Sequence, residues 1–370
     1  MRRRTLLTAG LAVAASATIT STSAAAADEV SPQRSAGPDF VALLDAVVTA
    51  GAVSAIAEVR EDTHVWRGGS GSAELGGHRA APVAGRYRAG SVTKTLVATV
   101  VLQLADEGRL RLSDSVEHWL PGLVPGGRRI TVRHLLQHMS GLFDYTSDLL
   151  PEPSAVLAIR SRTFQPVELV RIAVAHPPYF EPGTNQNYSN TDYILLGMII
   201  DRAAGRSWRT EAERRILRPL GLRDTELPGA SPRIAGPHAH VYIAAPDGVP
   251  VDVTTMNPTM AGAAGELIST TADLNRFFDT LLTPGCLLPT ATLADMTDPR
   301  DTGFGLGLEV ADLPTGRVFG HGGGGPGFLG LSFITADRAR QITLTSAVWG
   351  GEPHAAAAAM LMAALGGCLI

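Results

Sequence analysis

Apolar residues recur along this chain with two different periods, and the two periods occupy different parts of it. Helical spacing, with apolar positions three and four apart, is found in 39–50 and through most of 131–217. Short apolar runs bounded by turn residues are typical of strands, and they occur at 53–59, at 65–73 and between 305 and 348. Strands near both ends around a helical middle predict an α+β protein. We expect an antiparallel sheet flanked by helices, with an all-helical lobe inserted.

The first 27 residues are expected to be an export signal rather than part of the fold. Three arginines at 2–4 precede an apolar run at 6–19, and the alanines at 25–27 offer a cleavage site of the A-x-A type. The arginines suit twin-arginine export, and Sec export stays open. The apolar run is too short for a membrane span. We therefore expect a secreted, extracellular protein with no membrane span in its mature form.

Residues 28–370 are expected to form a single domain with two lobes. The α/β lobe comprises about 28–106 and 250–370, and the helical lobe about 107–249. The chain has a net charge of −4, and without the three leader arginines it has 28 basic against 35 acidic residues. The absence of a dense basic cluster in this sequence argues against a nucleic-acid partner. Its cysteines, Cys286 and Cys368, either form a disulfide or remain two thiols, and both alternatives stay open.

The segment R-A-G-S-V-T-K at 88–94 carries the first candidate chemistry. The apolar run after Gly90 has no further glycine or proline before Gly108, which predicts a buried helix that begins near Ser91. Ser91 and Lys94 then lie one turn apart on one face. Burial and the helix N-terminus make it easier for Lys94 to lose its proton, and a neutral amine can activate the serine hydroxyl. Taken alone, S-x-x-K is more often a capping serine followed by a surface lysine.

The second candidate is Tyr188-Ser189-Asn190, which directly precedes an apolar helical pattern at 191–204. A phenol whose pKa is lowered beside Lys94 can relay protons, and an asparagine amide can hydrogen-bond a substrate amide. The alternative is a turn with a buried tyrosine.

The third candidate is a histidine followed by glycines at the edge of a predicted strand. His321 could face a substrate carboxylate or assist proton transfer, while Gly322 and Gly323 let a ligand lie against bare backbone. The N–H of Gly324 and that of Ser91 would form an oxyanion hole. The alternative is a flexible glycine loop with an incidental histidine.

Two further patterns do not amount to sites. His134 and His138 are four residues apart but lack the glutamate of H-E-x-x-H, so we expect them to be structural rather than metal ligands. Residues 325–330 match G-x-G-x-x-G, but no helix is predicted after them, which argues against a dinucleotide site.

The order S-x-x-K, Y-x-N, H-G-G resembles that of the serine β-lactamase and penicillin-binding family. Within this family the tyrosine and histidine variants resemble the class C β-lactamases and, more closely, the secreted D-alanyl-D-alanine carboxypeptidases of actinobacteria. The resemblance covers nearly all of 38–366. Its other segments are Y-R-A-G-S-V-T-K at 87–94, I-T-V-R-H-L-L at 130–136, S-G-L-F-D-Y-T at 140–146, P-L-G-L at 219–222 and F-G-L-G-L at 304–308.

The resemblance implies acyl transfer in two steps. It makes Ser91 the nucleophile that forms an acyl-enzyme, and Lys94 and Tyr188 the groups that share the acid and base work, with His321 opposite the tyrosine. Which of the two takes the serine proton stays open, because such groups titrate as a unit. The resemblance also implies that Asn190 orients the acyl side chain and that no metal or organic cofactor is needed.

Departures from the family pattern bear on the substrate. Carboxypeptidases of the family often carry hydroxyl residues where this chain has Gly322 and Gly324, and some carry a cation where it has Glu309. Whether these residues exclude terminal carboxylates stays open. We expect a D-alanyl-D-alanine carboxypeptidase-like hydrolase acting on small peptides or esters, with peptidoglycan stem peptides and β-lactams as possible partners. The alternatives are an esterase, a D-amino-acid amidase, a transacylase, or a penicillin-binding sensor that never turns over.

Overall fold

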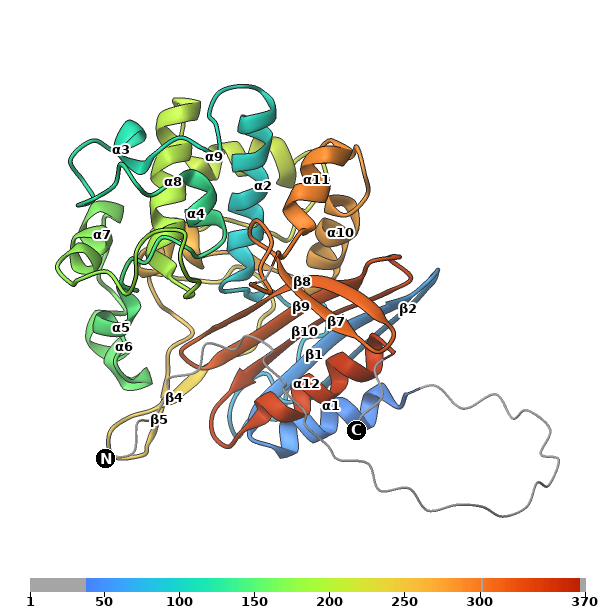
Figure 1. Ribbon diagram of the computed structural model, residues 1–370. Helices are drawn as coiled ribbons and strands as arrows, with labels where there is room; N and C mark the ends of the chain where they lie inside the picture. Colours follow the sequence, from blue (N-terminus) through green and yellow to red (C-terminus); the bar gives the residue numbers. More distant parts are fainter. Residues whose placement is uncertain (1–37, 301, 367–370) are drawn as a thin grey trace, which may run out of the picture.

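The computed structural model describes residues 38–300 and 302–366. In these ranges a six-stranded antiparallel sheet has the strand order β2-β1-β10-β9-β8-β7 (Figure 1). Its strands are β1 (Ala52–Glu61), β2 (His64–Gly71), β7 (Glu309–Leu313), β8 (Gly316–Gly325), β9 (Phe328–Thr335) and β10 (Arg340–Val348). The predicted export signal at 1–27 and Cys368 lie outside the described residues. Cys286 is exposed.

The two ends of the chain meet in this sheet. β1 pairs with β2 on one side and with β10 on the other, so that Ile56 lies between Gly69 and Thr345. The hairpin of β1 and β2 turns at Asp62, which has a positive φ of 50°. β1 is buried along most of its length because helices cover both faces of the sheet. The predicted α+β fold is confirmed.

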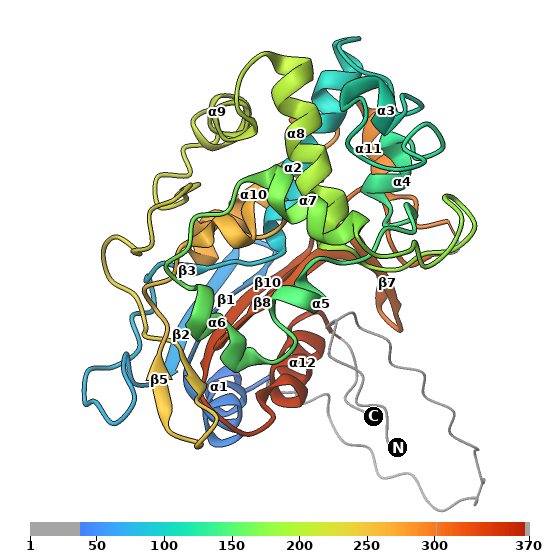
Figure 2. The same cartoon turned by 90° about the vertical axis from the view of Figure 1, so that its left-hand side faces the viewer.

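The helices form a layer on each face of the sheet (Figures 1 and 2). They are α1 (Phe40–Thr49), α2 (Val92–Asp106), α3 (Val116–Trp119), α4 (Val132–Leu136), α5 (Thr146–Leu149), α6 (Val156–Ile159), α7 (Pro166–Val174), α8 (Asn190–Ala204), α9 (Trp208–Ala212), α10 (Thr271–Leu281), α11 (Thr290–Thr297) and α12 (Pro353–Ala364). On one face α1 and α12 bury Leu44 and Leu361 in an apolar cluster with the sheet. On the other face α10 packs on β9 and β10, and α2 contacts β8 and α8.

The segment between α2 and α10 contributes no strand to the six-stranded sheet, and within it α4 to α9 lie at 132–212, where the periodicity predicts helices. It also holds a two-stranded ribbon of β4 (Tyr242–Ala244) and β5 (Pro250–Asp252), which the hydrophobic pattern did not predict. A second short pair, β3 (Tyr87–Arg88) with β6 (Ile268–Ser269), leads into α2. Among the described residues, no helix combines the length and the apolar character that a membrane crossing requires.

The helix α2 lies at the centre of the larger core. Nearly all of its residues are buried, including Thr93, Lys94 and Thr95. The threonines are satisfied locally, since Thr95 Oγ1 donates to Gly307 O at 2.8 Å. A helix that is surrounded on all sides is apolar all round. Lys94 is therefore the exception on this helix, and it marks the site described next.

Candidate active site

Ser91 directly precedes α2 in a turn that only glycine fits well. Gly90 has a φ of +54°, and a Cβ added there would lie 2.8 Å from Gly324 N. On the facing strand β8, a Cβ on Gly323 would lie 2.0 Å from Ala89 O and 3.1 Å from Ser91 N. The glycines of the first and third motifs thus allow two backbones to touch. This contact brings the predicted oxyanion donors, the N–H groups of Ser91 and Gly324, into the same small region.

Lys94 reaches Ser91 from the next turn of α2. Its Nζ donates to Ser91 Oγ at 3.0 Å, to Asn190 Oδ1 at 2.8 Å and to Ala264 O at 2.7 Å. The side chain is fully buried. Burial lowers the pKa of the Lys94 ammonium to about 7, and the nearby carboxylate of Asp144 opposes this shift. An amine with such a pKa is available as a base near neutral pH.

Tyr188 approaches the same serine from the residues just before α8. Its hydroxyl interacts with the Ser91 side chain, and the Lys94 Nζ lies 4.8 Å from the centroid of its ring. Burial raises the pKa of the Tyr188 hydroxyl well above its ordinary value, and the interaction with Ser91 only partly offsets this. The expectation of a lowered pKa beside Lys94 was therefore wrong. Burial penalises the phenolate more than its neighbours stabilise it.

Asn190, the first residue of α8, has both ends of its amide fixed. Its Oδ1 accepts from Lys94, while its Nδ2 donates to Asp144 Oδ2 at 3.0 Å and to Thr146 Oγ1 at 3.3 Å. Sequence reasoning missed Asp144 and Thr146 as members of the site. Both belong to the S-G-L-F-D-Y-T segment at 140–146, which was identified only as part of the family resemblance.

His321 lies on β8, and its ring centroid is 6.4 Å from that of Tyr188. The imidazole is buried, and its Nδ1 lies 3.3 Å from Glu309 Oε1. Burial lowers the pKa of His321 to about 3 and raises the pKa of Glu309 to about 7. The Glu309 carboxyl group lies against β8, next to His321. The side chain is 11% exposed, and Oε1 accepts from Gly322 N at 2.9 Å.

His138 supports Tyr188 from behind. The two rings lie 4.3 Å apart, and His138 Nδ1 accepts from Ser189 N at 3.2 Å. Burial lowers the pKa of His138 well below its ordinary value, so the ring is neutral. This agrees with the expectation of a structural role, although its contact with the second motif was not foreseen. Among the described residues, no three or more His, Cys, Asp or Glu side chains are grouped to hold a metal ion.

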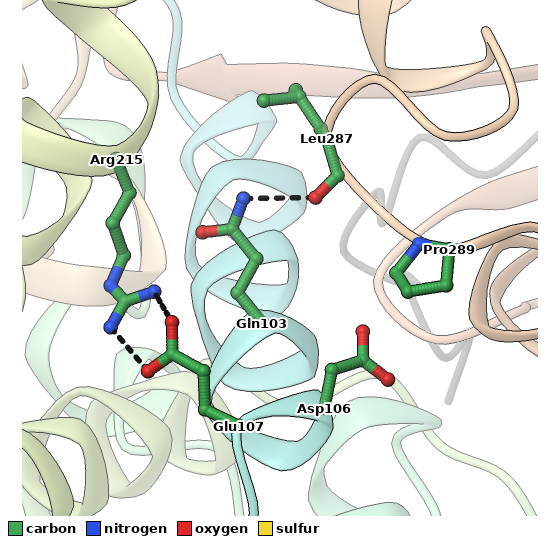
Figure 3. A pocket seen from close by; sticks show the side chains of 6 residues that line it. All are labelled: Gln103, Asp106, Glu107, Arg215, Leu287 and Pro289. Atoms are coloured by element: carbon green, nitrogen blue, oxygen red, sulfur yellow. Dashed lines mark hydrogen bonds and ion pairs between the residues drawn. The ribbon is translucent and has the colours of Figure 1, made fainter.

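A separate hollow lies at the opposite end of α2 from Ser91 (Figure 3). It is lined by Gln103, Asp106, Glu107, Arg215, Leu287 and Pro289. Glu107 and Arg215 pair with each other there, and Gln103 Nε2 donates to Leu287 O. Twelve residues of helix separate Gln103 from Ser91, which corresponds to about 18 Å. This hollow is therefore not part of the serine site.

The fold and the serine–lysine pair at the start of its central helix define a β-lactamase-fold serine hydrolase. Residues 40–366 match the family described as Beta-lactamase, and the chain belongs to that family. The resemblance seen in the three motifs is thereby confirmed. A D-stereospecific amidohydrolase from Streptomyces sp. is 39% identical, with a TM-score of 0.80 over 88% of this chain and 98% of that chain.

Two curated relatives are similar over shorter stretches. Penicillin-binding protein 4* of Bacillus subtilis is 29% identical over 278 residues, which are 70% of this chain and 60% of that protein. Esterase EstB of Burkholderia gladioli is 32% identical over 162 residues, 41% of either chain. The matched region therefore spans less than two thirds of the length of either relative.

Proposed function

We propose that this protein is an exported serine hydrolase that cleaves the amide bond on the carbonyl side of a D-amino-acid residue. The observation that carries the chemistry is the contact of Ser91 Oγ with Lys94 Nζ at 3.0 Å, beside the Tyr188 hydroxyl. The substrate class is supported by the likeness to the D-stereospecific amidohydrolase, which extends over 98% of that chain. It is also supported by the lack of hydroxyl groups at Gly322 and Gly324.

In the first step, neutral Lys94 takes the proton of Ser91 as Oγ forms a bond to the substrate carbonyl carbon. The N–H groups of Ser91 and Gly324 stabilise the resulting oxyanion. The carbon–nitrogen bond then breaks, and the leaving nitrogen receives a proton through the Tyr188 hydroxyl, which Lys94 replenishes. Ammonia or an amine departs, and the acyl group stays on Ser91 as an ester.

In the second step, water replaces the leaving group and the same groups work in reverse order. Lys94, neutral again, removes a proton from the water by way of Tyr188, and the water oxygen bonds to the ester carbon. The bond to Ser91 Oγ breaks, and Oγ recovers a proton. Lys94 is the better base of the two because its pKa is about 7, while burial keeps the phenol protonated.

A D-alanyl-D-alanine carboxypeptidase is the second candidate, and the likeness to penicillin-binding protein 4* favours it. It needs a group that binds the terminal carboxylate of the peptide. An esterase, favoured by the likeness to EstB, needs no such group. A sensor would be acylated on Ser91 and would never release the acyl group. The presence of both Lys94 and Tyr188 disfavours it, because a protein that only traps an acyl group does not need a base for deacylation.

The test is a panel of four substrates with the purified protein. These are a D-amino-acid amide, its L-enantiomer, an acyl-D-Ala-D-Ala peptide and a p-nitrophenyl ester. We expect the D-amide to be hydrolysed with a higher kcat/KM than the L-amide and the peptide, and Ser91→Ala to be inactive on all four. Release of D-alanine as the fastest reaction would establish the carboxypeptidase instead. A stable penicillin adduct without any turnover would establish the sensor.

A further inference from the structure

Glu309 completes a strand edge that would otherwise be open. β7 begins at Glu309, opposite Gly320, and from there it pairs back to Gly316. The part of β8 that follows Gly320 therefore has no backbone partner in β7. The Glu309 side chain takes that place, because its Oε1 accepts from Gly322 N at 2.9 Å. A buried carboxyl group is thus tied to the strand that carries His321.

The surroundings of His321 decide which ring nitrogen carries its proton. Nδ1 lies beside two acceptors, the carbonyl oxygen of Gly322 and Glu309 Oε1. A nitrogen that faces two oxygen acceptors is the protonated one in a neutral imidazole. The other nitrogen, Nε2, is then an unprotonated acceptor. Nε2 is buried and has no hydrogen-bond partner among the described residues.

An unpaired acceptor of this kind is costly in a folded protein unless a ligand satisfies it. A substrate N–H can pair with His321 Nε2. A substrate carboxylate cannot, since it offers only acceptors and would also lie near the Glu309 carboxyl group. The strand provides no compensating donor side chain, because glycines occupy 322–325.

We propose that Glu309 is a positioning residue that holds His321 with its proton on Nδ1, so that Nε2 accepts an N–H from the leaving portion of the substrate. The enzyme then selects leaving groups that end in an amide over those that end in a carboxylate. This inference rests on the proposed function and narrows it to neutral, amide-bearing leaving groups.

The kinetic test uses two dipeptides that differ only at the C-terminus, acyl-D-Ala-D-Ala with a free carboxylate and the same peptide as its carboxamide. We expect the wild-type kcat/KM to be at least about tenfold higher for the carboxamide, since one unmatched buried polar group has an effect of this size. Equal or faster turnover of the carboxylate overturns the inference. The two dipeptides are also compared as inhibitors of p-nitrophenyl ester hydrolysis. The ratio of their inhibition constants then reports the preference in binding even where turnover is slow.

Two variants separate positioning from a general structural effect. Glu309→Gln keeps an acceptor oxygen for Gly322 N and His321 Nδ1, so we expect the carboxamide preference to survive. Glu309→Met keeps the side-chain volume without the acceptor, so the preference should shrink by about tenfold, while hydrolysis of the ester changes much less. Loss of ester and carboxamide hydrolysis by the same factor in Glu309→Met overturns the positioning role.

The tautomer itself is measured without substrate. Nitrogen NMR of protein labelled at histidine distinguishes protonated from unprotonated ring nitrogens, and His321→Gln identifies the signal. We expect Nδ1–H in the wild type and Glu309→Gln. In Glu309→Met only the Gly322 carbonyl oxygen remains of the two acceptors beside Nδ1, so we expect a larger share of the Nε2–H form there than in the wild type. An Nε2–H form in the wild type overturns the inference even where D-amides are hydrolysed. Failure of every amide substrate in a protein with the Nδ1–H form overturns the proposed function instead.

Discussion

The two faces of the sheet are built to different rules. The face under α1 and α12 is closed by aliphatic and aromatic side chains such as Leu44, Leu361 and Phe333. The face under α10 and α2, which we call the chemical face, is just as buried, but it encloses Lys94, Glu309 and other ionisable groups. Several polar atoms there lack a partner among the described residues. Burying such groups lowers the free energy of unfolding. Their concentration on this face therefore indicates that they are kept for catalysis rather than for stability.

The largest effect is expected from removing the amine on the chemical face. Lys94→Met keeps the volume of the side chain and eliminates the base, so kcat/KM should fall by about a thousandfold or more. Steady-state kinetics on the best substrate of the panel measures this. The circular dichroism spectrum should stay unchanged. A variant that keeps a tenth of the wild-type rate would show that another group takes the serine proton.

A matched substitution on the other face of the sheet, under α1 and α12, should lower stability without lowering activity. Leu44→Ala removes a fully buried side chain from the cluster under α1, and the free energy of unfolding should fall by about 2–5 kcal/mol. Denaturant titration measures this loss. At 25 °C the kcat of the folded protein should not change, because α1 lies across the sheet from Ser91. A lower kcat at constant folded fraction would mean that the two faces are coupled.

The pH profile tests how the chemical face sets the state of its base. Lys94 must be neutral to accept the serine proton, and its pKa is about 7. We therefore expect kcat/KM to decline by about tenfold per pH unit as the pH drops below 7 and to be flat above it. Leu44→Ala should show the same profile as the wild type. An acidic limb centred near the pKa of an ordinary carboxyl group would contradict this assignment.

A smaller effect is expected at Asp144, which accepts from Asn190. Asp144→Asn brings two amide groups together and removes a negative charge near Lys94. We expect about a tenfold loss in kcat/KM, the size typical of one disrupted buried hydrogen bond. The acidic limb should move to lower pH, because the carboxylate no longer raises the pKa of Lys94. Asp148→Asn, four positions further along the chain and paired with His176 at the surface, is the control and should leave both quantities unchanged.

These residues also differ in how far their contacts could be predicted from the sequence. Ser91 and Lys94 are linked by helical spacing within one segment, so their contact could be predicted from the pattern alone. Asp144 contacts Asn190, which is 46 positions further along the chain, and a hydrophobic period cannot predict a contact at that separation. The raised pKa of Tyr188 was missed for a related reason. Its sign depends on how completely the surrounding core excludes water, which only the packed structure reveals.

The same limit applies to Glu309. Some carboxypeptidases of the family carry a cation at its position after F-G-L-G-L, and the sequence left open whether Glu309 excludes a terminal carboxylate there. The register of β7 against β8 directs the carboxyl group toward the Gly322 N–H. The fold class was accessible from the order of strand and helix patterns, since sheet and helix periods are local. Strand register and side-chain direction are not local, and they determine what Glu309 does.

The smallest effect is a pH dependence of stability that only the chemical face should produce. Glu309 titrates near 7 when folded and near 4.5 when unfolded, so unfolding releases a proton between these values and stability falls as the pH rises toward 7. Lys94 titrates near 7 when folded and near 10.5 when unfolded, so unfolding takes up a proton and stability rises again above 7. The two groups together therefore destabilise the protein most near pH 7. We expect the difference in Tm between a Glu309→Gln, Lys94→Met double variant and the wild type to peak there, while the difference for Leu44→Ala stays level with pH. A double variant whose Tm follows the wild type at every pH would mean that the buried charges are satisfied in the folded protein as well as they are in water.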